Sequence, residues 1–148
     1  MSTSVSGYLV LAFDRDRTVD VNPPADRSAV PLSWIEHWAN ETDHEVWAIG
    51  NQRLKSEAGI PGVREAVMRL ENEWYREFNE TDDDEHVDGW PRRARRVEML
   101  AELFPDADDY LVVDDKDLSY IEDWTHYYPW EFVDVVRSGD VDLEVTAD

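Results

Sequence analysis

The chain has no cysteine among its 148 residues, so neither a disulfide framework nor a thiolate metal site is available to it. It also lacks any apolar run of the roughly 18 residues that a membrane-spanning helix needs. Its first residues, MSTSVSG, have neither the basic charge nor the apolar stretch of a signal peptide. We therefore expect a cytoplasmic protein that has no membrane partner.

Basic residues are also scarce. The chain has 14 Lys and Arg against 35 Asp and Glu, a formal net charge of −21, and its only lysines are Lys55 and Lys116. Disorder is disfavoured, because 42% of the residues are hydrophobic and seven are tryptophan. An acidic surface can mimic nucleic acid, or it can keep a protein hydrated in a high-salt cytoplasm, where salt screens self-repulsion. Many aspartates and few lysines favour the second reading, and in this the composition resembles haloarchaeal proteins. Free nucleic acid is disfavoured as a partner by the same charge.

Short apolar runs alternate with stretches of helical periodicity, which predicts an α/β fold with a mainly parallel sheet. We expect a single Rossmann-like, three-layer domain over residues 1–148, with 1–7 and 146–148 frayed. The expected strands are Tyr8–Phe13, Glu45–Ile49, Tyr110–Val113 and Glu131–Val136, with an edge strand at Val141–Val145. The expected helices are one capped by Ser33 with Glu36 in a capping box, Val63–Phe78, Arg92–Leu103 and a short one at Leu118–Trp124.

Three of the expected strands end in polar residues. Asp14 follows the first strand, Gly50 and Asn51 follow the second, and Asp114 and Asp115 follow the third. In parallel sheets of this class, the site lies beyond the carboxyl ends of the strands. The sequence therefore predicts that these three polar segments meet, although they are far apart in the chain.

The first of these strand ends has the pattern Asp-x-Asp-x-Thr, in FDRDRT, and the third reads YLVVDDKD. This order of motifs resembles the haloacid dehalogenase (HAD) superfamily, and most of all its phosphatases with little or no cap. The resemblance runs from Tyr8 to about Val136. It implies a Mg²⁺-dependent phosphatase that hydrolyses a phosphomonoester of a small molecule or a macromolecule.

The resemblance also implies roles for five aspartates. Asp14 would be the nucleophile that forms an aspartyl-phosphate, because a carboxylate can divide one difficult displacement into two easier ones. Asp16 would protonate the leaving oxygen and then activate water. Mg²⁺ prefers oxygen ligands, and it would bind the carboxylates of Asp14 and Asp115 and the backbone carbonyl of Asp16. Asp114 would support the ligands from behind, and Asp117 would hold a metal-bound water.

The phosphate itself needs hydrogen-bond donors. The family places a Ser or Thr at the end of the second strand, where this chain has Gly50, so backbone N–H groups or the Asn51 amide would have to replace that hydroxyl. The family also places a Lys or Arg at a later helix start. The expected phosphate contacts are therefore Thr18, Gly50, Asn51 and Arg92, with Arg93, Arg95 or Arg96 as alternatives to Arg92.

Other readings of the same residues remain open. Aspartate favours turns, so Asp-x-Asp-x-Thr alone is compatible with an ordinary turn in an aspartate-rich chain. Gly50 in place of Ser or Thr also leaves room for a non-catalytic module, which would bind metal, phosphate or a basic protein without turnover. A zinc site is disfavoured, since the four histidines show no metal-binding spacing.

Overall fold

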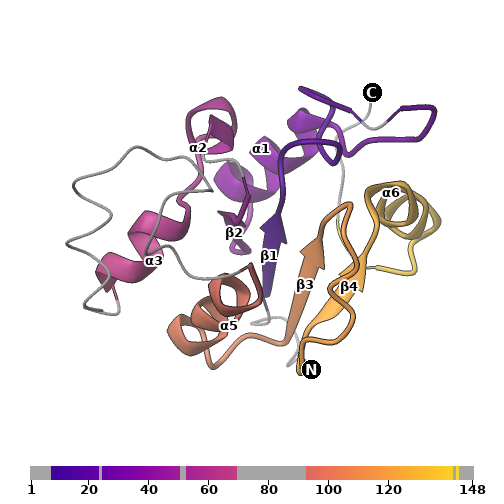
Figure 1. Cartoon of the computed structure of the whole chain (residues 1–148). Coiled ribbons are helices and arrows are strands. Elements are labelled where there is room, and N and C mark those ends of the chain that lie inside the picture. Colours follow the sequence, from indigo (N-terminus) through magenta and orange to yellow (C-terminus); the bar gives the residue numbers. More distant parts are fainter. Residues whose placement is uncertain (1–7, 24, 51–52, 70–92, 142, 144–148) are drawn as a thin grey trace.

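A computed structural model describes residues 8–23, 25–50, 53–69, 93–141 and 143 of the chain. Four parallel strands form one sheet in the order β2-β1-β3-β4 (Figure 1). They are β1 (Leu9–Phe13), β2 (Glu45–Ala48), β3 (Asp109–Val113) and β4 (Thr125–Tyr127). The expected α/β class with a parallel sheet is confirmed.

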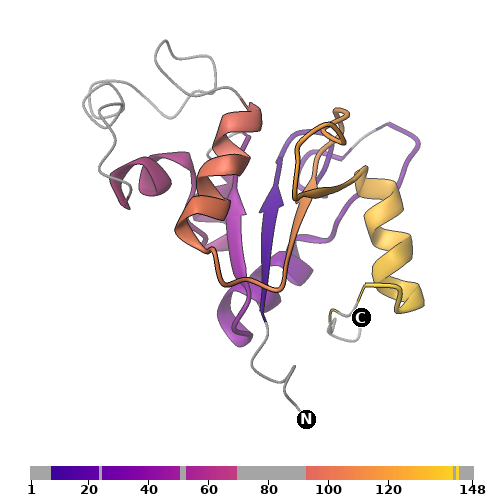
Figure 2. The ribbon, with the colours of Figure 1, turned by 90° about the horizontal axis from the view of Figure 1, so that it is seen from below.

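Helices cover both faces of the sheet, so the fold is a three-layer sandwich (Figure 2). On one face lie α1 (Leu32–Glu41), α2 (Arg53–Ala58) and α6 (Pro129–Ser138). On the other face lie α3 (Val63–Arg69) and α5 (Arg93–Leu103). This two-sided cover explains why the central strands read as unbroken apolar runs, since both of their faces are buried.

Side chains of β1 alternate between two apolar clusters. Leu11 and Phe13 pack toward α1 and α6, whereas Val10 and Ala12 pack toward α3 and α5. Phe13 stacks on Trp38 of α1 with ring centroids 6.2 Å apart and meets Phe132 of α6 edge-on at 5.7 Å. The aromatic residues on this face therefore tie α1 and α6 to the central strand.

The sheet register brings the polar strand ends to one edge. Phe13 is paired with Ala48 of β2 and with Val113 of β3. The ladder continues past the strands, because the N–H of Asp14 donates to the carbonyl of Val113 and that of Ile49 donates to Phe13, both at 3.0 Å. Asp14 and Asp114 thus follow the adjacent strands β1 and β3. The chain crosses from β2 on one side of β1 to β3 on the other, and parallel sheets bind ligands at such a switch point.

The prediction of a strand at Glu131–Val136 is wrong, because this segment lies within helix α6. Its buried residues Phe132, Val133 and Val136 follow helical rather than alternating spacing. Pro129 begins the helix, where a missing N–H costs nothing, and Gly139 ends it with φ of 87°. The composition of the run, rich in valine, concealed a helix whose ends are both marked in the sequence.

The predicted short helix at Leu118–Trp124 is also wrong. The N–H groups of Ile121 and Trp124 each donate to a carbonyl three residues back, at 3.2 and 3.3 Å, which makes two consecutive turns. Leu118, Ile121 and Trp124 are buried against the α5 face of the sheet. The segment directly after it, for which no strand was expected, pairs with β3 as β4.

The start of α1 differs from the predicted capping box on Ser33. The helix begins at Leu32, after Pro31, and its N-cap makes no side-chain hydrogen bond. The carboxylate of Asp20 instead accepts the N–H of Leu32 at 3.2 Å. A bridge between Val19 and Val30 brings Asp20 there, so a contact across the loop replaces the local cap.

Of the expected edge strand at Val141–Val145, the structure describes Val141 and Leu143, and neither lies in a strand. The expected helix Val63–Phe78 is described only as far as Arg69, and the part of the 92–103 helix that is described begins at Arg93. The remainder of these segments, together with residues 1–7 and 146–148, lies outside the described residues. Within the described part of the chain, no helix has both the length and the apolar character to cross a bilayer.

Candidate active site

Three carboxylates converge at the carboxyl edge of the sheet. Asp14 follows β1, and Asp114 and Asp115 follow β3. One carboxylate oxygen from each lies within 4.8 Å of the others. Asp114 is fully buried, Asp14 is nearly so, and Asp115 is half-buried. The predicted meeting of Asp14 with the Asp-Asp strand end is therefore present, and only Asp115 offers it substantial access to solvent.

Arg93, in the first turn of α5, reaches into this cluster. Its Nη1 lies 2.7 Å from Oδ2 of Asp114 and 3.0 Å from Oδ1 of Asp14. Asp114 is held in addition by the backbone N–H of Lys116, which donates to Oδ1 at 2.9 Å. One guanidinium thus bridges the two most buried carboxylates and fixes their separation.

The charge of the cluster is not balanced by this one arginine. Burial raises the pKa of Asp14 well above its usual range, and the carboxylates of Asp114 and Asp115 raise it further, while Arg93 opposes them. Burial also raises the pKa of Asp114, against the opposing effect of Arg93. When all three carboxylates are ionised, Arg93 leaves an excess of negative charge, which a divalent cation would offset.

The donor set fits Mg²⁺ in its chemistry. All three side chains offer hard carboxylate oxygens, which Mg²⁺ and Ca²⁺ prefer, and the half-buried Asp115 is partly exposed to solvent. Among the described residues, this is the one group of three acidic or histidine side chains that is close enough to hold a metal ion.

Gly50 and Thr18 both contact Asp14 directly. A Cβ built on Gly50 would lie 1.9 Å from Oδ1 of Asp14 and 3.3 Å from its Cα. The buried hydroxyl of Thr18 donates to Oδ2 of Asp14 at 3.3 Å. The place of the expected phosphate-binding hydroxyl is therefore filled by Asp14 itself, and Thr18 supports the proposed nucleophile.

The loop that follows Asp14 is compact. The N–H groups of Thr18 and Val19 donate to the carbonyl of Arg15 at 3.3 and 3.0 Å, and Arg17 has φ of 61°. Oδ1 of Asp16 accepts from Nη1 of Arg15 at 2.7 Å and from Nδ2 of Asn22 at 3.0 Å. Asp16 is 37% exposed, so it stands at the solvent side of the loop rather than inside the carboxylate cluster.

The candidates are the four arginines at 92, 93, 95 and 96, and the three that the structure describes do not all face the same direction on α5. Arg93 and Arg96, three residues apart, face inward, and Arg96 is buried and donates to the Ile49 carbonyl at 2.6 Å. Arg95 instead pairs with Glu98 and Glu102 on the outside of α5. Arg92 and Asn51 lie outside the described residues. Of the arginines that are described, Arg93 is the one that meets the carboxylates.

Asp117 and His126 lie close to the carboxylate cluster, at the segments that follow and flank the end of β3. Asp117 is exposed, and its carboxylate accepts the N–H and hydroxyl of Ser119 at 2.9 and 2.6 Å. His126 has a side chain only 3% exposed, and its Nε2 lies 3.0 Å from the Asp114 carbonyl. The burial of His126 beside Asp114 could not be expected from the sequence, because no strand was predicted at Thr125–Tyr127.

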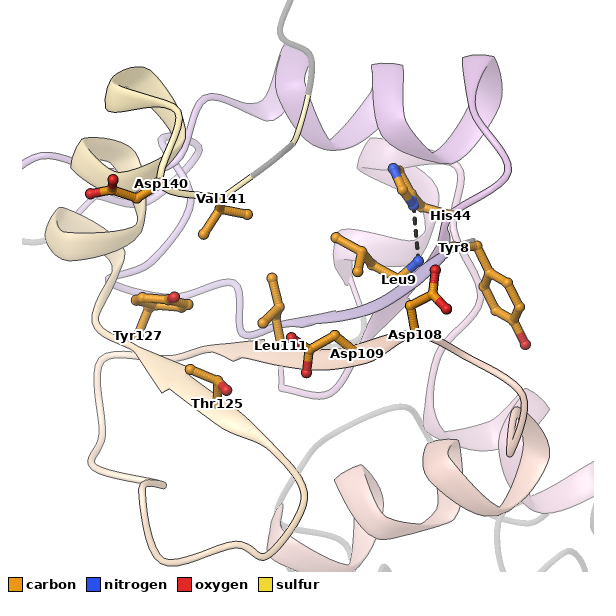
Figure 3. Close-up of a pocket in the computed structure, with 10 residues that line it drawn as sticks. All are labelled: Tyr8, Leu9, His44, Asp108, Asp109, Leu111, Thr125, Tyr127, Asp140 and Val141. Carbon is orange, nitrogen blue, oxygen red and sulfur yellow. Dashed lines mark hydrogen bonds between the residues drawn. The ribbon is translucent and has the colours of Figure 1, made fainter. Parts of the chain in front are cut away.

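A cavity of about 440 Å³ lies at the opposite, amino edge of the sheet (Figure 3). It is lined by residues of β1, β3 and β4, by residues directly before β1 and β3, and by the segment after α6. His44 stands at its rim, where its Nδ1 accepts the N–H of Leu9 at 3.0 Å. None of the three clustered aspartates lines this cavity, so it is separate from the candidate site.

Comparison of the chain with known proteins found no matching family model, curated protein or solved structure.

Proposed function

We propose that the protein is a Mg²⁺-dependent phosphomonoesterase of the HAD type, which acts through an aspartyl-phosphate on Asp14. The observation that carries the proposal is the convergence of Asp14, Asp114 and Asp115 within 4.8 Å, at the point where the strand order of a parallel sheet reverses. An ordinary turn after β1 has no reason to face a second acidic strand end at this distance. Arg93 at the same place supplies a guanidinium suited to phosphate oxygens.

In the first step, a carboxylate oxygen of Asp14 forms a bond to phosphorus as the bond from phosphorus to the leaving oxygen breaks. Asp16, two residues along the compact loop, donates a proton to that oxygen and the alcohol departs. Arg93 would then exchange its contacts with Asp14 and Asp114 for phosphoryl oxygens, or share them.

In the second step, a water oxygen attacks the aspartyl-phosphate as Asp16, now ionised, accepts a proton from that water. The bond from phosphorus to the Asp14 oxygen breaks, which restores the carboxylate and releases inorganic phosphate. Asp14, Asp115 and the backbone carbonyl of Asp16 would hold Mg²⁺, with Asp114 and Asp117 outside them. When bound, Mg²⁺ supplies positive charge that allows a phosphate to approach several carboxylates.

The test is release of phosphate from aryl and alkyl phosphates with MgCl₂ in molar KCl, which suits the acidic composition. Asp14→Asn should reduce the rate to that of a blank without protein, whereas Asp106→Asn, at an exposed aspartate outside the cluster, should not. Equal rates for wild type and Asp14→Asn would contradict the proposal.

A second candidate is a module that binds metal or phosphate without turnover. It is favoured by the engagement of both Asp14 oxygens, Oδ1 with Arg93 and Oδ2 with Thr18, and by the absence of a hydroxyl at position 50. The same assay separates the two. A module of this kind would be stabilised by Mg²⁺ in thermal denaturation but would release no phosphate from any ester.

A further inference from the structure

Arg15 stands between the two proposed catalytic aspartates in the chain and is held by a residue of a different element. Its Nε and Nη2 donate to Oε1 and Oε2 of Glu57, at 2.7 and 2.9 Å. Glu57 lies in α2, 42 residues further along the chain. This is the two-bond, fork-to-carboxylate geometry that gives an arginine pair its directional strength.

The third nitrogen of the same guanidinium contacts Asp16. Nη1 of Arg15 donates to Oδ1 of Asp16 at 2.7 Å. A guanidinium is planar and rigid, so fixing Nε and Nη2 on Glu57 also fixes the direction in which Nη1 points. The position of the Asp16 carboxylate is therefore coupled, through the Arg15 side chain, to Glu57 of α2.

The Arg15 and Glu57 side chains that couple α2 to Asp16 are largely buried, which restricts their movement. The Arg15 side chain is 13% exposed and that of Glu57 is 28% exposed, whereas Asp16 is 37% exposed and stands in a turn. Asn22 contacts the same oxygen, Oδ1, at 3.0 Å. Arg15 and Asn22 thus donate to the same oxygen of Asp16, Oδ1, and these two hydrogen bonds orient the carboxylate.

We infer that Glu57 is a positioning residue: through Arg15, it fixes the Asp16 carboxylate where it can deliver a proton to the leaving oxygen. This inference rests on the proposed phosphatase function. General acid catalysis requires the acid within about 2.6–3.2 Å of the oxygen it protonates. Without its two hydrogen bonds to Glu57, the Arg15 side chain can change rotamer. The Asp16 carboxylate, which Arg15 holds through Nη1, then loses its fixed position.

The consequence depends on the leaving group. As the bond between phosphorus and the leaving oxygen breaks, an alkyl oxygen must gain a proton from Asp16, because an alkoxide is a very poor leaving group. A nitrophenolate leaves as a stable anion and gains little from that proton. Loss of positioning should therefore slow alkyl phosphates much more than nitrophenyl phosphate, whereas general damage to the fold should slow both equally.

The experiment compares kcat/KM for p-nitrophenyl phosphate and for a simple alkyl phosphate, in molar KCl with saturating MgCl₂. Since a positioned general acid contributes about 10²–10⁴-fold, we expect Glu57→Gln to lose about 10- to 100-fold on the alkyl ester and only about 3-fold or less on the nitrophenyl ester. Arg15→Lys, which keeps the charge but lacks the planar fork, should show the same selective loss.

The matched control is Glu65→Gln. Glu65 forms a nearby ion pair with Lys55 of α2, at 2.9 Å, and its other carboxylate oxygen accepts the N–H of Gly62 at 2.9 Å. It should leave the ratio of the two substrates unchanged. An unchanged ratio in both Glu57→Gln and Arg15→Lys, with active wild type, overturns the positioning role alone. A wild type that hydrolyses neither ester overturns the proposed function, and the positioning role with it.

Discussion

Gly50 lies directly against the carboxylate of Asp14, so closely that a Cβ on Gly50 would be 1.9 Å from Oδ1. The contact couples the end of β2 to the end of β1 at the point where the proposed chemistry takes place. Ser or Thr at position 50, as in the HAD superfamily that the motifs resemble, cannot coexist with Asp14 in this conformation.

Gly50→Ala should destabilise the protein and impair its activity together. The added methyl group must displace the Asp14 side chain, whose contacts with Arg93 and Thr18 are then lost. Overpacking of this kind typically costs about 1–3 kcal/mol. Urea denaturation in molar KCl with EDTA measures the cost, and phosphate release measures the effect on Asp14. If Gly50→Ala or Gly50→Ser retained full stability and activity, Asp14 would have to adopt another position in solution.

The raised pKa of Asp14 predicts how stability depends on pH in the absence of metal. The folded state retains a proton on Asp14 at pH values where the unfolded chain, with a pKa of about 3.9, has released it. The unfolding free energy should therefore fall as pH rises from about 4 through the raised folded pKa. Asp14→Asn removes this titration and should become the more stable of the two proteins at neutral pH.

Urea denaturation of both proteins across this pH range, with EDTA in molar KCl, checks the prediction. The quantity to follow is the unfolding free energy of wild type minus that of Asp14→Asn, because titrating groups that do not interact with Asp14 cancel in the difference. The difference should become more negative as pH rises. A difference that stays constant, or that grows more positive, would mean that Asp14 is not buried beside Asp114 in the folded protein.

Mg²⁺ should stabilise the folded protein through Asp14 and Asp115. A ligand that binds only the folded state adds about 2.7 kcal/mol at a concentration 100 times its Kd, and the excess of carboxylates at this site favours a cation. Asp115→Asn should weaken the stabilisation, while Asp106→Asn should leave it intact. Thermal denaturation over a MgCl₂ titration at constant molar KCl provides the measurement. Equal stabilisation of Asp115→Asn and wild type would place the ion elsewhere.

Much of the fold could be predicted because it depends on local pattern. The apolar runs ending at Phe13, Ile49 and Val113 form strands since each is short, unbroken and followed by polar residues. Trp34, Ile35 and Trp38 recur at helical spacing and are buried in α1. Helix α6 was missed because its valine-rich run also fits a short apolar strand, and the signals at its two ends, Pro129 and Gly139, were not used.

The apolar runs of the sequence are enough to place Asp14 and Asp115 after buried strands. Parallel pairing then brings them to the same edge of the sheet, because the carboxyl ends of parallel strands lie side by side. Tertiary structure alone decided that Arg93 meets Asp14, that Glu57 reaches Arg15, and that Gly50 must lack a side chain. These contacts join residues from different elements over distances of a few ångströms. The periodicity of a chain records which face a residue occupies, whereas such contacts depend on how the elements pack.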